Sequence, residues 1–342
     1  MKTTYILGAG ASHAVWKFPL MKGFLKECEE QLTEPRFDGL RKFLAKGFGD
    51  LSALNLEDVL SDLDNTIHGL GSVWFGAEGD ERRSKANRMQ AALVRLICER
   101  LRLPNDIPPE CERAYGRVFS DIRLGDSVIT FNYDTGFEEY AQSSEKKDVF
   151  SDMLSITWAH DLLSDLHPHS LQNRWGWGSE HSVLLKLHGS VDYGCCSNRA
   201  CPVRASIAFP RGESAGGPNA PRMCPVCGAD TETVIVPPTI TKTFEHVPKL
   251  SLLWRMAQRH IAASPRLVVW GFSCPASDHH VAWLLRSCRD GSALREVVVI
   301  DPDHKEVRER LRPLLDPHAE VEWAQFEGHD EYGQHAQGSG RA

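Results

Sequence analysis

Near the start of the chain stands the segment that decides the fold, Thr3-Thr4-Tyr5-Ile6-Leu7-Gly8-Ala9-Gly10-Ala11-Ser12. It opens with a short β-prone apolar run, and the glycines that follow close a tight loop from which a helix can start. Because glycine has no Cβ, a phosphate group can approach this backbone and meet the free N–H groups of the helix. The segment predicts a strand, a phosphate-binding loop and a helix. A turn without a ligand is the alternative, since His13 stands where the dinucleotide fingerprint has its third glycine.

Further apolar runs of β type follow along the chain. They span residues 127–131, 183–187, 234–236, 267–270, 297–300 and, with fewer apolar residues, 321–323. Helical stretches separate several of these runs, and the runs are apolar on both faces, which is typical of buried parallel strands. The pattern predicts an α/β, Rossmann-like fold with a mainly parallel sheet and helices on both faces.

Two segments interrupt this alternation. Residues 37–122 carry apolar side chains at helical spacing and predict a helical insertion. Residues 193–233 are rich in Gly, Pro and Cys and predict a small, loop-rich insertion. Residues 1–36 and 123–330 are expected to form the Rossmann-like domain. The polar, glycine-rich end at 331–342 is expected to be a disordered tail.

The composition of the 342 residues is that of a folded globular protein, with 42% hydrophobic and 25% charged residues. No apolar run approaches the roughly 20 residues that a membrane-spanning helix needs. The first residues lack the apolar core of a secretory signal, so a cytoplasmic protein without membrane contact is expected. A net charge of -7 argues against nucleic acid as the main partner.

Ten cysteines are present, and in a reducing compartment clustered cysteines are more often metal ligands than disulfides. Cys224 and Cys227 have the spacing of a zinc knuckle, with a glycine directly after the second thiol. Cys196 and Cys201 can supply the other pair, with Cys195 as a competitor for the first position. We expect these four thiolates to hold a structural Zn²⁺ within the insertion 193–233. Unligated surface cysteines are the alternative.

The motif Thr130-Phe131-Asn132-Tyr133-Asp134 follows the second clear strand. The carboxyl ends of parallel strands gather the ligand contacts of α/β sheets, so Asn132 stands where a functional side chain is expected. An Asx-turn or helix cap that closes the strand is the alternative.

A third polar motif, His188-Gly189, follows the apolar run Leu184-Leu185-Lys186-Leu187. A neutral imidazole can take a proton from a sugar hydroxyl or from water near physiological pH. His188 is therefore a candidate base, although a lone histidine at a strand end is often structural.

These motifs, in this order, resemble the sirtuin family, whose pattern includes Gly-Ala-Gly-x-Ser, Thr-x-Asn-x-Asp and a strand followed by His-Gly. The resemblance extends to Gly271-Phe272-Ser273 after a later strand and to Asp301 after the next. It implies that Asn132 positions the nucleophile and that His188 is the catalytic base. It also implies that the zinc module follows His188. The residues that the resemblance assigns to NAD are Gly8, Ala9, Gly10, Ser12, Thr130, Asp134, Gly271, Ser273 and Asp301.

One element of the deacylase pattern is absent. The family has Asp-Phe-Arg after a proline, and here Leu20-Met21-Lys22 follows Pro19. With the helical insertion, this departure favours the divergent prokaryotic branch that acts as NAD glycohydrolases in anti-phage defence. In that branch water replaces the acyl-lysine, so the products would be nicotinamide and ADP-ribose.

Two other functions remain open. The first is an NAD-dependent protein-lysine deacylase, which the zinc module and His188 allow. The second is a non-enzymatic NAD-binding regulatory subunit. The resemblance implies a homo-oligomer, and the helical insertion could dock that oligomer or a defence partner such as an ATPase or an Argonaute-like protein.

Overall fold

The computed structural model describes the chain except residues 53, 69–75, 105, 147, 151–181, 199, 203–222, 225, 237–247, 276–277, 288–292, 317–319 and 339–342. The chain forms two compact units. The first unit comprises Met1–Trp16, Leu103–Ile235 and Phe244–Ala342, and the second comprises Lys17–Arg102 and Val236–Thr243.

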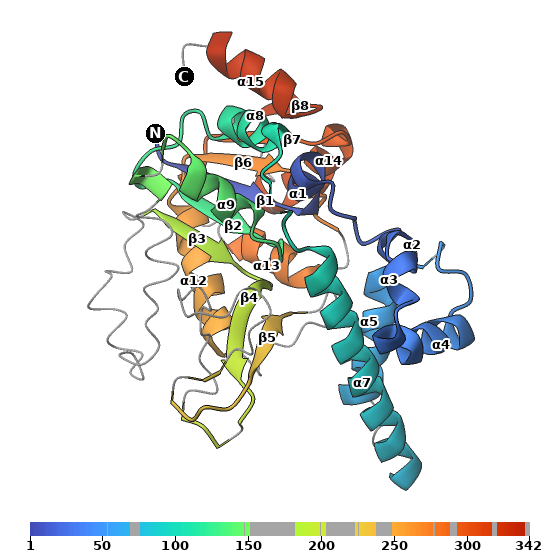
Figure 1. Ribbon diagram of the computed structural model, residues 1–342. Coiled ribbons are helices and arrows are strands. Elements are labelled where there is room, and N and C mark those ends of the chain that lie inside the picture. The colour runs from blue at the N-terminus through green and yellow to red at the C-terminus, as the bar shows by residue number, and fades with distance from the viewer. Residues whose placement is uncertain are drawn as a thin grey trace. The chain divides into compact units, whose positions relative to one another are not determined.

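A six-stranded parallel sheet forms the centre of the first unit (Figure 1), in the order β3-β2-β1-β6-β7-β8. Its strands are β1 (Thr3–Leu7), β2 (Ser127–Thr130), β3 (Val183–Lys186), β6 (Arg266–Trp270), β7 (Glu296–Ile300) and β8 (Glu322–Phe326). β1 pairs on both sides, with Thr4 opposite Ser127 and opposite Leu267. Every residue of β1, β2, β3 and β6 is buried, as the uninterrupted apolar runs predict. The predicted mainly parallel sheet is confirmed.

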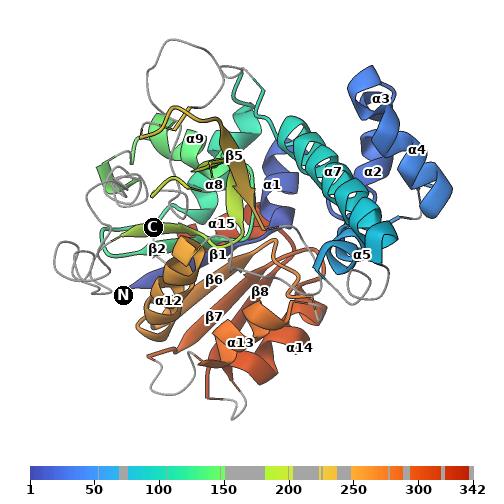
Figure 2. The same cartoon turned by 90° about the horizontal axis from the view of Figure 1, so that it is seen from below.

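Helices cover both faces of this sheet (Figure 2). On one face lie α1 (Ala9–Trp16), α8 (Pro109–Val118), α9 (Gly136–Ser143) and α15 (His329–Gly338), and on the other lie α12 (Pro248–Ala262), α13 (His279–Ser287) and α14 (His304–Leu315). Within the first layer α8 contacts α1, α9 and α15, and within the second α13 contacts α12 and α14. Aromatic rings pack between the sheet and the first helix layer. The centroids of Tyr5 and Phe119 are 4.7 Å apart, and those of Tyr115 and Trp270 are 5.4 Å apart.

The second unit is helical. It contains α2 (Phe24–Glu27), α3 (Glu29–Leu32), the 3-10 turn η1 (Pro35–Phe37), α4 (Asp38–Gly47), α5 (Leu56–His68) and α7 (Gly76–Arg100). α5 and α4 both pack on α7, and the apolar stripe of α5 from Leu56 to Ile67 is buried. This unit begins at Lys17 and its first segment ends at Arg102, whereas the expected insertion begins at 37 and ends at 122. Helical periodicity shows that a helix has an apolar face, but it does not show which core that face packs against. α8 packs on the sheet of the first unit, through Tyr115 and Trp270.

A separate antiparallel hairpin consists of β4 (Gly189–Cys196) and β5 (Thr231–Ile235). The run at 234–236 therefore does not add a strand to the parallel sheet. β5 buries Val234 while two of its preceding residues are exposed, which is a pattern of one-sided burial.

The expected disordered tail at 331–342 is wrong for residues 331–338, which belong to α15. Tyr332 is 1% exposed, and its hydroxyl accepts a hydrogen bond from Arg266 Nη2 at 3.0 Å. One turn later Ala336 is also buried. These two buried side chains, Tyr332 and Ala336, hold a helix of otherwise polar composition in place. In the described part of the chain, no helix combines the length and the apolarity that crossing a membrane requires.

Candidate functional site

The strand order creates a switch point between β1 and β6. From β1 the sheet grows through β2 and β3 in one direction, and from β6 it grows through β7 and β8 in the other. Ligands of open α/β sheets bind outside the carboxyl ends of the strands at such a point. Gly8 directly follows β1 and Gly271 directly follows β6, so the predicted glycine loop lies at this position.

Two glycine loops pack backbone against backbone there. Gly10 N donates a hydrogen bond to Gly271 O at 2.8 Å. A Cβ on Gly8 would lie 2.4 Å from Gly271 O, and a Cβ on Gly271, whose φ is +61°, would lie 2.0 Å from Ala11 N. Real Cβ atoms do not approach this closely, so the contact between the loops itself requires glycine. Ala9 is exposed at the start of α1.

Asn132 ties the end of β2 to this glycine loop. Its Nδ2 donates to Gly8 O at 2.8 Å and to Ser12 Oγ at 2.9 Å. Its backbone N–H donates to Thr130 Oγ1 at 3.0 Å. The structure therefore brings together four of the predicted site residues. Both amide donors of Asn132 are engaged, which leaves Oδ1 as the atom through which the side chain could orient a ligand.

Asp134 lies one turn further and is buried. Its Oδ1 accepts a hydrogen bond from Gly136 N at 2.9 Å, so the carboxylate closes the turn that precedes α9. The alternative of a helix-capping turn therefore describes Asp134 well.

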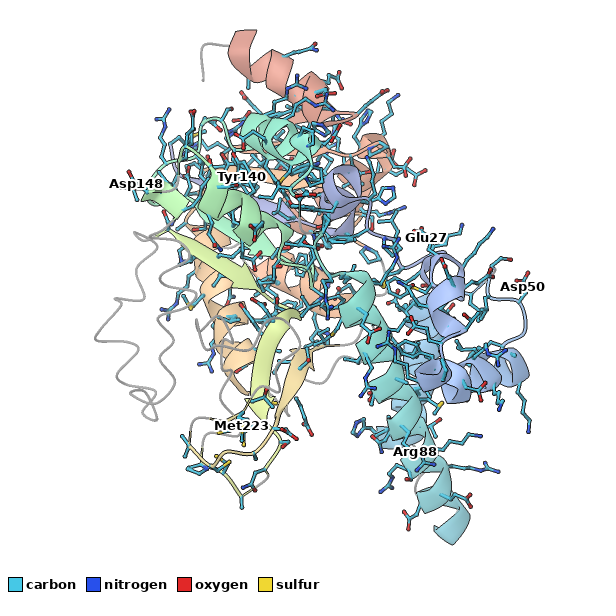
Figure 3. The ribbon with its side chains drawn as sticks, in the orientation of Figure 1. Glu27, Asp50, Arg88, Tyr140, Asp148 and Met223 are labelled. Carbon is cyan, nitrogen blue, oxygen red and sulfur yellow. The ribbon has the colours of Figure 1, made fainter. Side chains whose placement is uncertain are left out.

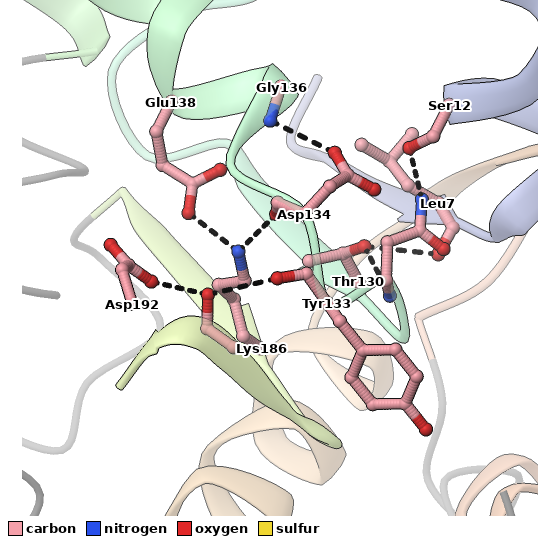
Figure 4. A network of polar contacts seen from close by, with 11 residues as sticks. Leu7, Ser12, Thr130, Tyr133, Asp134, Gly136, Glu138, Lys186 and Asp192 are labelled. Carbon is pink, nitrogen blue, oxygen red and sulfur yellow. Dashed lines mark hydrogen bonds and ion pairs between the residues drawn. The ribbon is translucent and has the colours of Figure 1, made fainter. Parts of the chain in front are cut away.

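Next to it, Lys186 Nζ bonds Asp134 O and pairs with Glu138 Oε1 at 2.7 Å, with both side chains buried (Figure 4). Burial raises the pKa of Glu138, and the Lys186 ammonium opposes that shift. The sequence reasoning missed this pair. Its signal is a lysine within an otherwise apolar strand.

His188 follows β3 and is only 6% exposed. Its Nε2 lies 3.8 Å from Asp278 Oδ2. The centroid of its ring lies 5.1 Å from that of Phe131, 6.0 Å from that of Trp254 and 6.5 Å from that of Tyr133. Trp254 is held by a hydrogen bond from its Nε1 to Leu187 O at 3.1 Å. His188 therefore lies among aromatic rings, and the carboxylate of Asp278 is close to its Nε2.

Asp278 and Trp254 were missed by the sequence reasoning. The signal for Asp278 was the cluster Asp278-His279-His280 at the start of an amphipathic helix, close after Gly271-Phe272-Ser273. Phe272 also belongs to this environment, because its ring stacks on Phe131 with centroids 4.7 Å apart.

Ser273 and Asp301 lie at the ends of β6 and β7 but are engaged locally. Ser273 is exposed, and its carbonyl oxygen accepts from Arg310 Nη1 at 2.9 Å. Asp301 Oδ1 accepts from Asp303 N at 2.9 Å, and burial raises the pKa of Asp301. In the described part of the chain no hydrogen bond or ion pair joins these two side chains to Asn132 or His188. The turn alternative accounts for Asp301.

The four predicted metal ligands meet at one end of the hairpin. Their sulfur atoms all lie within 4.8 Å of one another, with Cys196 and Cys227 at 3.4 Å and Cys201 and Cys224 at 3.9 Å. A tetrahedral zinc site with Zn–S bonds of about 2.3 Å places its sulfurs about 3.8 Å apart, whereas a disulfide requires about 2.0 Å. The cluster fits a closed structural zinc site. Cys195 stays outside, because neighbouring residues of a strand point to opposite faces.

The knuckle turn holds two of these ligands in place. Cys224 N donates to Ala229 O at 2.6 Å, and Gly228 N donates to Cys224 O at 2.8 Å. Backbone hydrogen bonding from Ala229, with a contribution from Cys196, lowers the pKa of Cys227 to about 7. A lowered pKa favours the thiolate that a metal requires. Met223, which is 62% exposed, stands beside the knuckle at this end of the hairpin (Figure 3).

No family model and no curated protein matches the chain. Among solved structures it is similar to a mutant Sir2 homologue in complex with ADP ribose, at 15% identity and a TM-score of 0.44, covering 99% of this chain and 92% of that one. It is also similar to a Sir2 homologue in complex with NAD, at 14% identity and a TM-score of 0.42, covering 99% and 90%. A Sir2 protein bound to an acetylated peptide is similar at 12% identity and a TM-score of 0.41, covering 99% and 93%.

Proposed function

We propose that this chain binds NAD at the carboxyl edge of its parallel sheet and hydrolyses the bond between nicotinamide and ribose. The observation that carries the proposal is the pair of hydrogen bonds from Asn132 to Gly8 O and Ser12 Oγ. These bonds join the residue that would orient the nucleophile to the loop that would hold the pyrophosphate. His188, at the end of the neighbouring strand, supplies a base in surroundings with little exposure to water.

The reaction needs only these groups and water. The bond from ribose C1′ to the nicotinamide nitrogen breaks, and its electron pair leaves with nicotinamide. The sugar passes through an oxocarbenium-like state, to which a water oxygen adds at C1′. Asn132 Oδ1 accepts a hydrogen bond from this water, and His188 takes the proton that the water releases. The products are nicotinamide and ADP-ribose.

The proposed zinc ion has a structural role. Cys196, Cys201, Cys224 and Cys227 would occupy all four positions of a tetrahedral ion, so no position stays open for a substrate. When bound, the ion would crosslink the chain that leaves β4 to the chain that enters β5, at one end of the hairpin.

A role as an effector of prokaryotic anti-phage defence is part of the proposal. The motif order and the missing Asp-Phe-Arg after Pro19 support it. The compact helical unit Lys17–Arg102 is our candidate for docking a second copy or a defence partner, such as an ATPase or an Argonaute-like protein. We propose that the protein acts in the cytoplasm as a homo-oligomer.

The test is an NAD consumption assay on the full chain. Nicotinamide and ADP-ribose are measured by chromatography, with and without an acyl-lysine peptide, for the wild type, Asn132→Ala and His188→Ala. Peptide-independent release that both variants abolish supports the hydrolase. Release that requires the peptide assigns a deacylase instead, and NAD binding without turnover assigns the regulatory subunit. Gly328→Ala is the control and keeps full activity, because it lies outside the proposed docking unit and a Cβ there meets no atom within 4 Å.

A further inference from the structure

We propose that Asp278 is the positioning residue of this site, which orients His188 and stabilises its protonated form during the reaction. The inference rests on the proposed hydrolysis of NAD and names a residue that the motif resemblance does not include. The observation is the approach of Asp278 Oδ2 to His188 Nε2 at 3.8 Å, across 90 residues of sequence by their numbering, with both side chains 7% exposed.

The carboxylate of Asp278 is held by the start of α13. Its Oδ1 accepts a hydrogen bond from Val281 N at 3.3 Å, and its backbone carbonyl accepts from Ala282 N at 3.0 Å. The N-terminus of a helix favours a negative charge at this position. One oxygen is anchored to the helix, and the other faces the imidazole.

The imidazole is confined by its neighbours. The ring of Phe131 and the ring of Trp254 lie near it, and Trp254 is itself fixed by Leu187 O. With Nε2 directed at a carboxylate, the tautomer that carries its proton on Nε2 is favoured, and Nδ1 keeps the lone pair that accepts a proton. A separation of 3.8 Å is an ion-pair distance, and catalytic hydrogen bonds are often long before a substrate binds.

Asp278 then serves two steps of the reaction. Before proton transfer it selects the tautomer of His188 whose Nδ1 is the base. After transfer its charge stabilises the imidazolium, because an opposite charge at this distance favours the charged form. The proton moves from water to Nδ1, and Asp278 remains a carboxylate throughout.

Other titratable groups surround the pair and must be separated from its effect. The elements packed around it carry Tyr133, Cys274, His279, His280, Arg286 and Arg310. Burial, with the charge of Asp278 second, raises the pKa of Cys274 to about 11, so this thiol stays neutral at physiological pH. Because His279 and His280 also lie near the pair, a histidine titration has to be assigned to His188 by its own resonance.

The experiment reads His188 directly and does not depend on turnover. The full chain is labelled with 13C at histidine Cε1, and the resonance that is missing from His188→Gln is assigned to His188. In Asp278→Asn its titration midpoint is expected to fall by about one pH unit, since the charge that favours the imidazolium is gone. Asp278→Glu keeps a carboxylate, so its midpoint should lie close to that of the wild type. Asp303→Asn is the matched control, because Asp303 also precedes a helix that begins with histidine, and it leaves the midpoint unchanged.

The kinetic arm uses the same variants. Asp278→Asn is expected to lower kcat about 10- to 100-fold, which is no more than the lower end of the roughly 100- to 10,000-fold that a positioned base contributes. The acid limb of the rate profile should move to lower pH. An unchanged midpoint in folded Asp278→Asn overturns the role of Asp278, whatever its activity. If the midpoint shifts but the wild type consumes no NAD, the interaction of Asp278 with His188 stands and the proposed hydrolysis of NAD is wrong.

Discussion

The side-chain nitrogen of Asn132 lies 2.8 Å from the carbonyl oxygen of Gly8, and this contact joins the ends of two neighbouring strands. The same nitrogen reaches Ser12 Oγ at 2.9 Å. Asn132 therefore holds the glycine loop as well as standing where it would orient a nucleophile. A variant at this position changes the loop and the chemistry together, and the two effects have to be measured separately.

Replacing Asn132 with Asp tests the hydrogen bonds. The new carboxylate has nearly the same shape but cannot donate to Gly8 O, so the free energy of unfolding is expected to fall by about 1 to 3 kcal/mol. Ser12→Ala, which removes one of the two acceptors, should cost about 1 kcal/mol. Urea unfolding followed by circular dichroism measures both. Equal stability of Asn132→Asp and the wild type would contradict the contact, and Asn87→Asp is the control for the substitution itself.

Gly271→Ala tests the packing of the two glycine loops. The new methyl group would meet the backbone nitrogen of Ala11 at 2.0 Å, and φ is +61°. We expect a loss of about 2 kcal/mol or more in unfolding free energy, together with weaker NAD binding, because the backbone of both loops must shift.

Gly328→Ala is the matched control in the same unit, since a Cβ there meets no atom within 4 Å. Its unfolding free energy should change by less than about 1 kcal/mol. If Gly271→Ala were as stable as Gly328→Ala, the close approach of the loops would be wrong.

Cys227 is expected to be the most reactive ligand once metal is removed. It is exposed and its pKa is lowered to about 7, whereas burial raises the pKa of Cys28 and of Cys111 to about 12. After treatment with a chelator, alkylation of Cys227 by iodoacetamide should increase through pH 7 as its thiolate forms, while Cys28 and Cys111 stay unmodified in the folded protein. Peptide mass spectrometry measures each site, and added Zn²⁺ should protect Cys227.

Metal content gives the companion measurement. Cys196→Ser should lose zinc, and Cys195→Ser should retain about one ion per chain, because the four ligands of a structural site come from the cluster. The opposite result would assign Cys195 as the ligand.

The buried pair of Lys186 and Glu138 is expected to be costly to break. Glu138→Gln leaves a buried ammonium without a counter-charge, so the loss should be about 3 to 5 kcal/mol. The double variant Lys186→Met with Glu138→Gln removes both charges and should recover a large part of that loss. Urea unfolding of the two single variants and the double variant gives the coupling, and additive losses would show that the two side chains do not interact.

Several parts of the fold could be predicted from local patterns. The runs around Ile6, Ile129, Leu185 and Val268 are apolar at consecutive positions and rich in β-branched residues, which is typical of strands buried on both faces. The hairpin strand at Val234 was harder to place, because a short apolar run does not reveal which sheet it joins.

Helical periodicity likewise does not show which part of the fold a helix packs against. α8 looks like the helices before it in sequence, yet its Tyr115 packs on Trp270 of β6, and Phe119, directly after the helix, packs on Tyr5 of β1. The polar end of the chain also looked unstructured, and the burial of Tyr332 against Phe326 orders it. In both cases a few apolar contacts outweigh the local composition.

The sequence by itself determined that Gly8, Asn132 and His188 each follow a strand of one parallel sheet, and therefore lie at the same edge of it. It also determined the cysteine spacing that a zinc ion needs. Only the tertiary structure decided that Asp278 faces His188, that Asp134 turns inward and that Cys196 rather than Cys195 joins the cluster. The physical reason is the range of the forces involved: strand periodicity is local, whereas the pairing of polar side chains depends on how distant helices and strands pack.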